Sequence, residues 1–278
     1  MSSVRTADEA ARQEVAANPV WYHTMELAPG LVTPGWFDLR PIIERLPWPD
    51  LVGKRCLDVG PYDGYLGFEM ERRGAAEVVA ADVAESTDWD WPLRLRESGP
   101  RGLAARGITD PGRGFAIAKR LLGSDVERVK ISAYDLDPAE LDRFDFVSCG
   151  SLLLHLRDPV RALEAIRSVC GGSLLSCEQI SAELTIRRRS AAADFRFGEV
   201  CQWWIPNPAG HRALLYAAGF TVERSTRPYA IPLGPGHPAV GRLGERKLRE
   251  RLLGRMLTRG TGVPHVASLA TPQPIGKR

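Results

Sequence analysis

A short segment near residue 60 combines glycines and acidic residues in a pattern that can hold a nucleoside. Gly60 and Gly64 let the backbone turn tightly and approach a ligand, because glycine has no Cβ. Asp58 precedes this turn inside an apolar run, and Asp82 ends the next apolar run, 18 residues past Gly64. A carboxylate in that place can accept hydrogen bonds from the two hydroxyls of a ribose. The spacing therefore predicts a site for an adenosine.

The residue in the middle of this turn narrows the choice of ligand. The turn carries Tyr62 at a position where dinucleotide-binding turns often have glycine. The tyrosine side chain obstructs the close backbone approach that a pyrophosphate needs. S-adenosylmethionine (SAM) has no phosphate and tolerates a tyrosine better. The turn therefore favours SAM over a nicotinamide dinucleotide.

Two polar residues near the ends of later apolar runs could act on a second substrate. His155 follows the run at 144–149 and is a candidate general base, with a structural hydrogen-bonding role as the alternative. Glu178 lies in the run at 172–179 and could orient an acceptor. No metal site is predicted, because the remaining histidines lack a second ligand at metal-like spacing. Those considered for a metal are His23, His211 and His265.

Aromatic and basic residues offer further contacts for a planar or anionic acceptor. Trp36 and Trp204 could form an aromatic wall, or could pack in the core. Asn207 could contact the substrate, or could cap the helix that follows it. The arginine run at 187–189 is either a solvated surface or a dock for a phosphate or carboxylate of the substrate.

The elements that must position these residues alternate between strand and helix. This alternation predicts the α/β class, with a doubly wound, mostly parallel sheet of seven strands. Helices are expected near 65–73, 114–122, 158–169, 208–218 and 240–258. Strands are expected near 54–59, 77–82, 127–132, 144–149, 172–179, 220–227 and 263–270.

The chain divides into a short N-terminal part and one large domain. Residues 1–50 are rich in aromatic residues and proline, and we expect a cap packed on the sheet edge or a lid over the ligand. Residues 51–278 form the ligand-binding domain, with a basic helical insertion near 236–260. The stretch at 84–112 is longer than an ordinary connection between a strand and a helix, which indicates a functional or mobile segment.

Composition agrees with an ordinary globular protein. The chain has 37 basic and 34 acidic residues, and a net charge of +3 is too small to indicate nucleic-acid binding by itself. The five cysteines form no C-x-x-C pair, and three of them lie in apolar runs, as buried free thiols in a reducing compartment do. No apolar run is long enough for a membrane span or a signal peptide. We therefore expect a cytoplasmic protein that does not associate with membranes.

An ordered set of motifs resembles the class I SAM-dependent methyltransferases. The motifs lie at residues 57–60 (Leu-Asp-Val-Gly), 81–82 (Ala-Asp), 134–136 (Tyr-Asp-Leu), 144–147 (Phe-Asp-Phe-Val) and 153–159 (Leu-Leu-His-Leu-Arg-Asp-Pro). Within that superfamily the chain resembles the group around the tRNA wobble-uridine carboxymethyltransferases. The segments that carry this likeness lie at 120–123, 154–159, 204–207 and 218–220. The resemblance also implies that the last strand pairs antiparallel.

The resemblance implies a role for each cofactor residue. Asp58 and the turn with Gly60, Tyr62 and Gly64 would hold the methionine end of SAM, and Asp82 would bind the ribose. Two of the acids have alternative roles. Asp82 could cap a helix, and Asp135, which follows the third strand, could be an ordinary turn residue. The further predicted contacts are Val83 on the adenine, Asp135 and Leu136 at its edge, and Gly150 and Ser151 at the pocket floor.

One residue departs from the carboxymethylating group. Those enzymes carry a tyrosine directly before the histidine of this motif, and here the residue is Leu154. Ordinary SAM is therefore the predicted cofactor, and the predicted reaction is methyl transfer to a hydroxyl, or less favourably an amine, of a small-molecule acceptor in specialised metabolism. One alternative is modification of a tRNA anticodon uridine, and another is a SAM-fold protein that binds without catalysis. A homodimer is left open.

Overall fold

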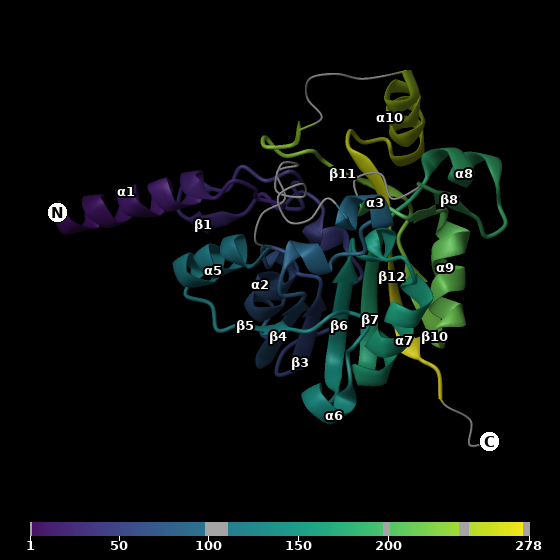
Figure 1. The fold of residues 1–278 in the computed structure, drawn as a ribbon, viewed down its shortest axis with the longest axis horizontal. Helices are drawn as coiled ribbons and strands as arrows, with labels where there is room; N and C mark the ends of the chain where they lie inside the picture. The colour runs from purple at the N-terminus through teal and green to yellow at the C-terminus, as the bar shows by residue number, and fades with distance from the viewer. Residues whose placement is uncertain (1, 98–110, 197–200, 239–244, 275–278) are drawn as a thin grey trace.

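The computed structural model describes residues 2–97, 111–196, 201–238 and 245–274, and they build a central sheet covered by helices on both faces (Figure 1). Among these residues the sheet has eight strands, in the order β10-β12-β7-β6-β3-β4-β5, with β11 added beside β12. The strands are β3 (Arg55–Val59), β4 (Glu77–Asp82), β5 (Glu127–Lys130), β6 (Phe144–Gly150), β7 (Cys170–Gln179), β10 (Phe220–Ser225), β11 (Tyr229–Ile231) and β12 (Val263–Pro272).

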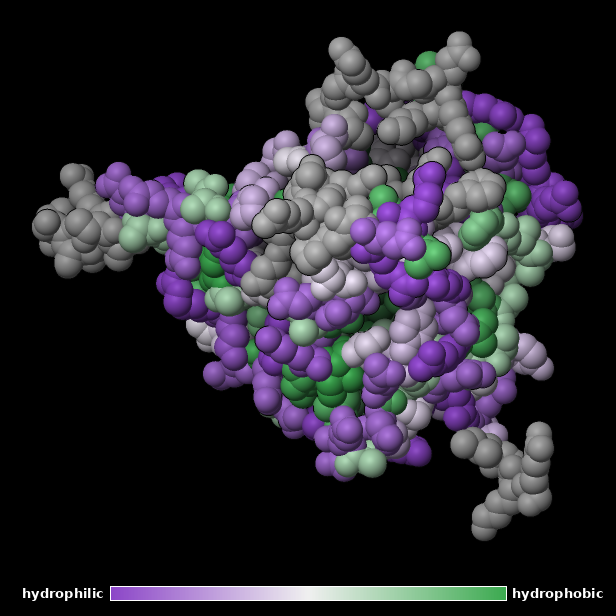
Figure 2. All heavy atoms as spheres, viewed as in Figure 1, coloured by the Kyte–Doolittle hydropathy of each residue, from purple (hydrophilic) through white to green (hydrophobic). Residues whose placement is uncertain are grey.

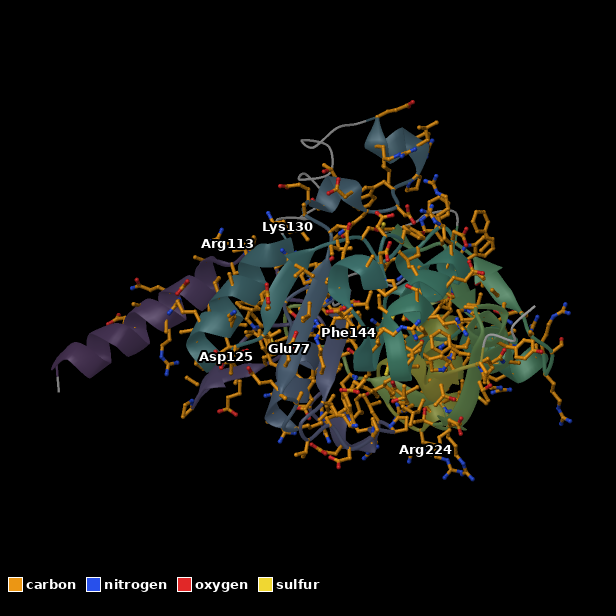
Figure 3. The ribbon with its side chains drawn as sticks, turned by 90° about the horizontal axis from the view of Figure 1, so that it is seen from below. Glu77, Arg113, Asp125, Lys130, Phe144 and Arg224 are labelled. Atoms are coloured by element: carbon orange, nitrogen blue, oxygen red, sulfur yellow. The ribbon has the colours of Figure 1, made fainter. Side chains whose placement is uncertain are left out.

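The predicted seven strands and their directions are confirmed, and the short β11 is an addition. β3 pairs parallel with β4 and β6, and the parallel pairing continues to β5 and β7. β12 runs antiparallel between β7 and β10, as expected for the last strand. In Figure 3, Lys130, which ends β5, lies apart from Glu77 and Phe144, which begin β4 and β6. The carboxyl ends of the parallel strands therefore meet at one edge of the sheet.

The helices form two layers around this sheet, each with its own apolar core. One core joins the sheet to α2, α5 and the N-terminal segment, and the other joins it to α7 and α9. The strands between these layers are buried on both faces, as in other parallel sheets. The helices are α1 (Ser2–Ala17), α2 (Tyr65–Arg72), α3 (Leu93–Arg96), α5 (Pro111–Leu122), α6 (Pro138–Leu141), α7 (Pro159–Val169), α8 (Ala182–Arg187), α9 (Pro208–Ala217) and α10 (Glu245–Thr258).

Short elements complete the chain. Two small hairpin-like sheets pair β1 (Glu26–Ala28) with β2 (Leu31–Val32) and β8 (Ala193–Phe195) with β9 (Trp204–Pro206). Three 3₁₀ turns lie at η1 (Ile43–Arg45), η2 (Ser86–Asp88) and η3 (Leu153–His155).

The segment after α1 is packed firmly against the body of the protein. Trp21 is 1% exposed, and its indole N–H donates to the carbonyl of Val15. Phe37 forms a bridge to His23 on one side and to Leu233 on the other. These contacts favour a packed cap over a hinged lid for this segment. α1 itself extends away from the sheet (Figure 1).

Three apolar side chains at helical spacing on α10 do not pack against the body of the protein. Leu248, Leu252 and Met256 are 51%, 57% and 75% exposed. The helix packs instead through Gly254, where a Cβ would lie 2.9 Å from Pro264. The close approach at this glycine turns the other face, with the three apolar side chains, to solvent.

The surface and the thiols agree with the composition. Hydrophilic side chains cover most of the face in Figure 2, with separate apolar patches. In the part of the chain that the structure describes, no helix is long and apolar enough to cross a membrane. The three cysteines in apolar runs, Cys56, Cys149 and Cys177, are buried and free as predicted, and Cys170 and Cys201 are buried and free as well.

Candidate functional site

The turn between β3 and α2 adopts the left-handed conformations that its glycines predict. Gly60 has φ 72° and Gly64 has φ 92°, and a Cβ on Gly64 would lie 2.6 Å from the Phe68 ring. Tyr62 has φ 54°, which costs a residue other than glycine roughly 1–2 kcal/mol. Its ring lies 5.4 Å from that of Tyr22, a contact that helps to offset this cost. The turn thus has the shape of a glycine turn despite the tyrosine.

Asp82 lies at the carboxyl end of β4 and holds the turn in place. One carboxylate oxygen accepts from the Tyr62 N–H at 3.3 Å, and the other from the Val83 N–H at 2.9 Å. Burial raises the pKa of Asp82, and the Arg128 guanidinium at 3.8 Å opposes that rise. These contacts place the carboxylate where a ribose would meet the turn, and no helix begins at Asp82 for it to cap.

Asp58 lies beneath the turn, 1% exposed. Its Oδ1 accepts from the Ser148 hydroxyl at 2.6 Å, while Oδ2 has no hydrogen-bond partner among the described residues. Burial raises its pKa to about 6, although the hydrogen bond from Ser148 lowers it. A buried acid with a spare oxygen is compatible with the role expected of Asp58 at the methionine end of SAM, where it could order the turn or meet the amino group through water, and this role stays a prediction.

Glu178 lies near the end of β7 and links this strand to the turn after β6. Its Oε1 accepts from the N–H groups of Leu152 and Leu153, both at 3.1 Å. Its Oε2 is buried without a partner within the described residues. Burial raises the pKa of Glu178 from 4.5 to about 8, so the carboxyl is largely protonated at neutral pH and can donate a hydrogen bond.

His155 ends η3, and one of its ring nitrogens makes a hydrogen bond within the protein. Nδ1 lies 2.7 Å from the carbonyl of Cys201 and must donate to it, which leaves Nε2 with a lone pair. Burial lowers the pKa of His155, so the ring is neutral at pH 7. No described residue occupies Nε2. This tautomer can accept a proton, as a general base must.

The turn after β6 packs against the end of the sheet. The Ser151 hydroxyl lies 3.0 Å from Nε2 of His265 and 3.2 Å from the carbonyl of Cys177. A Cβ on Gly150 would lie 2.8 Å from the Cys177 side chain, so this position needs glycine. Contacts within the protein therefore fix Gly150 and Ser151 at the end of β6, and their role at the floor of a cofactor pocket stays a prediction.

Aromatic rings gather beside the glycine turn. The Tyr22 ring lies 6.1 Å from that of Trp36, and the Tyr62 ring lies 6.3 Å from that of Trp89. Trp36 is half-buried and also contacts His237. The structure thus joins the N-terminal segment, the turn and the stretch after β4 in one aromatic group, which can offer a face to a planar acceptor.

Sequence reasoning missed the residue that makes this arrangement possible. Asp63 is fully buried, and its carboxylate accepts from the N–H groups of Tyr22 and His23, both at 2.8 Å, and pairs with the His23 ring. This acid ties the N-terminal segment to the glycine turn and so brings Tyr22 to the site. An acid between Tyr62 and Gly64 was the available signal, although its partners lie 40 residues earlier.

The residues predicted at the adenine occupy different environments. The Asp135 side chain is 69% exposed and lies 3.8 Å from Arg161. Leu136 is buried in the core, and its carbonyl accepts from Ser168 on α7. Val83 follows Asp82 and is half-buried. The packing gives Leu136 a core role, and the adenine contacts of Asp135 and Val83 stay predictions.

Asn207 is a helix cap and not a substrate contact. It is 1% exposed, and its side-chain oxygen accepts from Gly210 and Ala192 while its amide donates to the carbonyls of Arg188 and Ser190. These bonds use its full hydrogen-bonding capacity, so the predicted substrate role is corrected to the cap alternative. Trp204 remains half-buried beside Phe195, with its indole N–H donating to the carbonyl of Arg157, and its substrate role stays a prediction.

The carboxyl edge of the sheet therefore brings most of the predicted site together. These residues lie at, or directly after, the carboxyl ends of β3, β4, β6 and β7: the turn, Asp82, Gly150, Ser151 and Glu178. Within the described residues no cluster of three metal-ligating side chains occurs.

Comparison with known proteins agrees with this geometry. A family model described as a methyltransferase domain matches residues 38–225. A ubiquinone biosynthesis O-methyltransferase of Neisseria meningitidis is 33% identical over 116 residues, covering 42% of this chain and 39% of that protein. The same-named protein of Pseudomonas entomophila is 30% identical over 169 residues, covering 59% of this chain and 58% of that protein. The chain thus spans less than two thirds of the length of these relatives.

Solved structures give a broad likeness of lower identity. A SAM-dependent methyltransferase from Mesorhizobium loti covers 84% of this chain and 97% of its own, with 14% identity and a TM-score of 0.48. A Burkholderia thailandensis 1,6-didemethyltoxoflavin-N1-methyltransferase with bound S-adenosylhomocysteine covers 80% and 72%, with 16% identity and a TM-score of 0.48. The narrower resemblance to the tRNA wobble-uridine group finds no support in these comparisons.

Proposed function

The chain belongs to the methyltransferase domain family, and from that premise we propose that it is a SAM-dependent enzyme of class I that methylates a hydroxyl group of a small-molecule acceptor. The observation that carries the choice of a hydroxyl is the tautomer of His155, whose Nε2 lone pair can remove a proton from the acceptor. The O-methyltransferase names of the relatives support the same choice. The expected place in specialised metabolism stays a prediction.

The residues of the edge fit SAM as the cofactor. The turn at 60–64 holds Gly60 and Gly64 at positive φ, as a tight nucleoside-binding turn requires, and Asp58 keeps a buried oxygen without a partner among the described residues. Bound SAM supplies an electrophilic methyl group on a sulfonium. The turn would hold the methionine end and Asp82 would bind the ribose.

The acceptor would be held by the groups that the cofactor leaves free. Protonated Glu178 can donate a hydrogen bond to an acceptor oxygen, and the rings of Tyr22 and Trp36 can pack on a planar body. Holding the nucleophile in line with the methyl group at roughly 3 Å would supply much of the rate enhancement. Proton removal by His155 would then complete the transfer.

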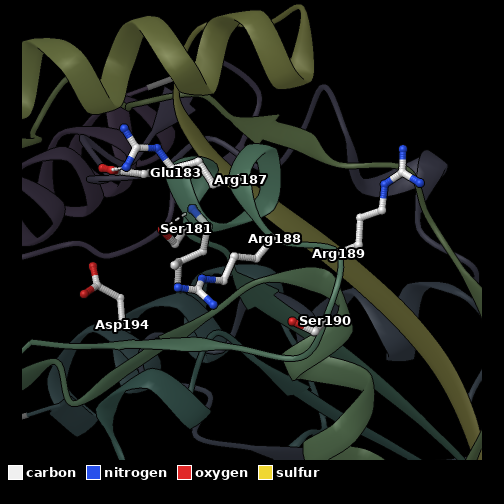
Figure 4. A pocket seen from close by; sticks show the side chains of 8 residues that line it. Ser181, Glu183, Arg187, Arg188, Arg189, Ser190 and Asp194 are labelled. Carbon is white, nitrogen blue, oxygen red and sulfur yellow. Dashed lines mark hydrogen bonds and ion pairs between the residues drawn. The ribbon is translucent and has the colours of Figure 1, made fainter.

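The charges around the arginine run at 187–189 bear on the tRNA alternative. α8, which ends at Arg187 of the arginine run, lies beside α10 (Figure 4), and an RNA surface would require these basic elements on one face. However, Glu183 pairs with Arg187, and Asp194 pairs with a neighbouring arginine, so acids interrupt the described part of this face. This charge pattern favours a small acceptor over a long polyanion.

The transfer of radioactive methyl groups from SAM tests this proposal. The purified protein should label phenols or other hydroxyl compounds in a screen, and mass spectrometry should locate the methyl group on oxygen. Labelling of amines alone would contradict the choice of acceptor atom. Binding of SAM without any turnover would instead support the non-catalytic alternative.

A further inference from the structure

A cavity separate from the predicted cofactor site lies beyond the end of β7, beside the predicted acceptor site. It has a volume of about 720 Å³ and opens to solvent between α8, α10 and the turn that follows α8 (Figure 4). Its lining residues are Ser181, Glu183, Leu184, Arg187, Arg188, Arg189, Ser190 and Asp194. Ser181 comes three residues after Glu178, so their Cα atoms are at most about 11 Å apart.

The acids of this pocket are already neutralised. Glu183 pairs with Arg187 at 3.2 Å and with Arg249 of α10 at 3.4 Å. Asp194 pairs with Arg196 at 3.1 Å. Because these carboxylates are already paired, they repel an anion less. They also leave the charge of any further arginine in the pocket without a paired acid.

Two lining arginines are such cations. Arg188 and Arg189 form no ion pair with any described residue, although both line the pocket. In Figure 4 the Arg188 guanidinium extends between Ser181 and Asp194, while Arg189 extends to the opposite side. Arg188 therefore presents the positive charge inside the pocket, with Arg189 at its rim.

The backbone that carries these arginines is fixed from beneath. Buried Asn207 donates to the carbonyls of Arg188 and Ser190 at 3.1 and 2.9 Å, and its own N–H donates to the carbonyl of Ala192. A Cβ on Gly210 would lie 2.5 Å from the same Ala192 oxygen, so only glycine permits this close approach. A guanidinium on a rigid backbone loses less freedom on binding a ligand than one on a free loop.

We propose that this pocket binds an anionic group, a phosphate or carboxylate, of the methyl acceptor. A guanidinium recognises such groups by two parallel charge-assisted hydrogen bonds. The short chain path from Ser181 to Glu178 keeps the lining of this pocket near the carboxyl proposed to hold the acceptor. The inference rests on the proposed function and narrows it to acceptors that carry a negative charge.

Titration calorimetry with inorganic pyrophosphate tests this site without knowledge of the acceptor. The full-length protein should bind pyrophosphate, and Arg188→Gln should weaken this binding roughly tenfold or more. The control Arg224→Gln removes an exposed arginine on β10, outside the pocket (Figure 3), and should leave the affinity unchanged. S-adenosylhomocysteine is titrated into the same three proteins.

The outcomes separate the pocket from the proposed function. Equal pyrophosphate binding by the wild type and Arg188→Gln, or no binding by the wild type, would overturn the anion site. Failure of S-adenosylhomocysteine to bind any of the proteins would instead count against the proposed function. If tRNA binds with an affinity that depends on Arg188 while pyrophosphate does not bind, the pocket is part of an RNA surface and the proposal is wrong.

Discussion

Replacing Glu178 by glutamine should stabilise the protein, and the gain should grow with pH. Glutamine keeps an oxygen that can accept from the N–H groups of Leu152 and Leu153. It also places an N–H₂ donor where the protonated carboxyl of Glu178 has its O–H, so the native state changes little. The unfolded state changes more, because the variant no longer has a carboxylate that must take up a proton on folding.

The pKa of Glu178 sets the size of the gain in stability. Burial raises the pKa of Glu178 from 4.5 to about 8, so between these values folding binds a proton, and stability falls by about 1.4 kcal/mol per pH unit as pH rises. The cost of keeping the acid is about 1 kcal/mol at pH 5, about 3 kcal/mol at pH 7 and about 4 kcal/mol at pH 8. Glu178→Gln removes this cost, while methyl transfer should fall if the carboxyl orients the acceptor.

Urea unfolding followed by tryptophan fluorescence measures this effect at pH 5, 6, 7 and 8. The difference between Glu178→Gln and the wild type should rise by about 3 kcal/mol across this range. The control Glu140→Gln changes an exposed carboxyl on α6 and should shift stability by less than about 0.5 kcal/mol at every pH. A difference that does not depend on pH, or one that falls with pH, would refute the reasoning.

Three other substitutions test the remaining parts of the site. Gly64→Ala should lower the free energy of unfolding by about 2–4 kcal/mol, because a Cβ would lie 2.6 Å from the Phe68 ring at a positive φ; an unchanged urea midpoint would contradict this. His155→Gln should lower kcat about 100-fold with little change in the affinity for S-adenosylhomocysteine, and wild-type kcat should fall only below pH 6.5, since burial lowers the pKa of His155; equal losses of both would indicate a structural role. Trp36→Ala should raise the acceptor KM more than it lowers kcat, and steady-state kinetics that show the reverse would exclude a packing role for the ring.

The strands of the sheet were predictable because their apolar runs are regular. Runs such as 77–82 are continuous, as strands buried on both faces require, and glycine or aspartate marks their ends. The exposure of Leu248 and Leu252 was not predictable, since it depends on which face of α10 meets β12. The close contact between Gly254 and Pro264 decides which face of the helix packs. The spacing of apolar residues in α10 or β12 does not reveal this contact.

The site was predictable where local spacing determines it. Gly60, Gly64 and Asp82 follow from turn geometry and strand ends, and the structure places them together. The role of Asp63 depends on two N–H groups 40 residues away, which local spacing cannot show. Asn207 shows the opposite case, since its position before a helix already indicated a cap. Its side chain makes four hydrogen bonds, which leave none for a substrate. The sequence could not show them, because they form only when the turn at 188–192 folds beneath it.

Calorimetric titration with SAM, S-adenosylhomocysteine and NAD, on the wild type and on Asp82→Asn, tests the central claim most directly. The wild type should bind both SAM compounds with micromolar affinity and should not bind NAD. Asp82→Asn should weaken both by roughly tenfold or more, because it removes the charge from the ribose hydrogen bonds. Equal affinity in the two proteins, or no binding of SAM by the wild type, would contradict the assignment of the carboxyl edge as the cofactor site.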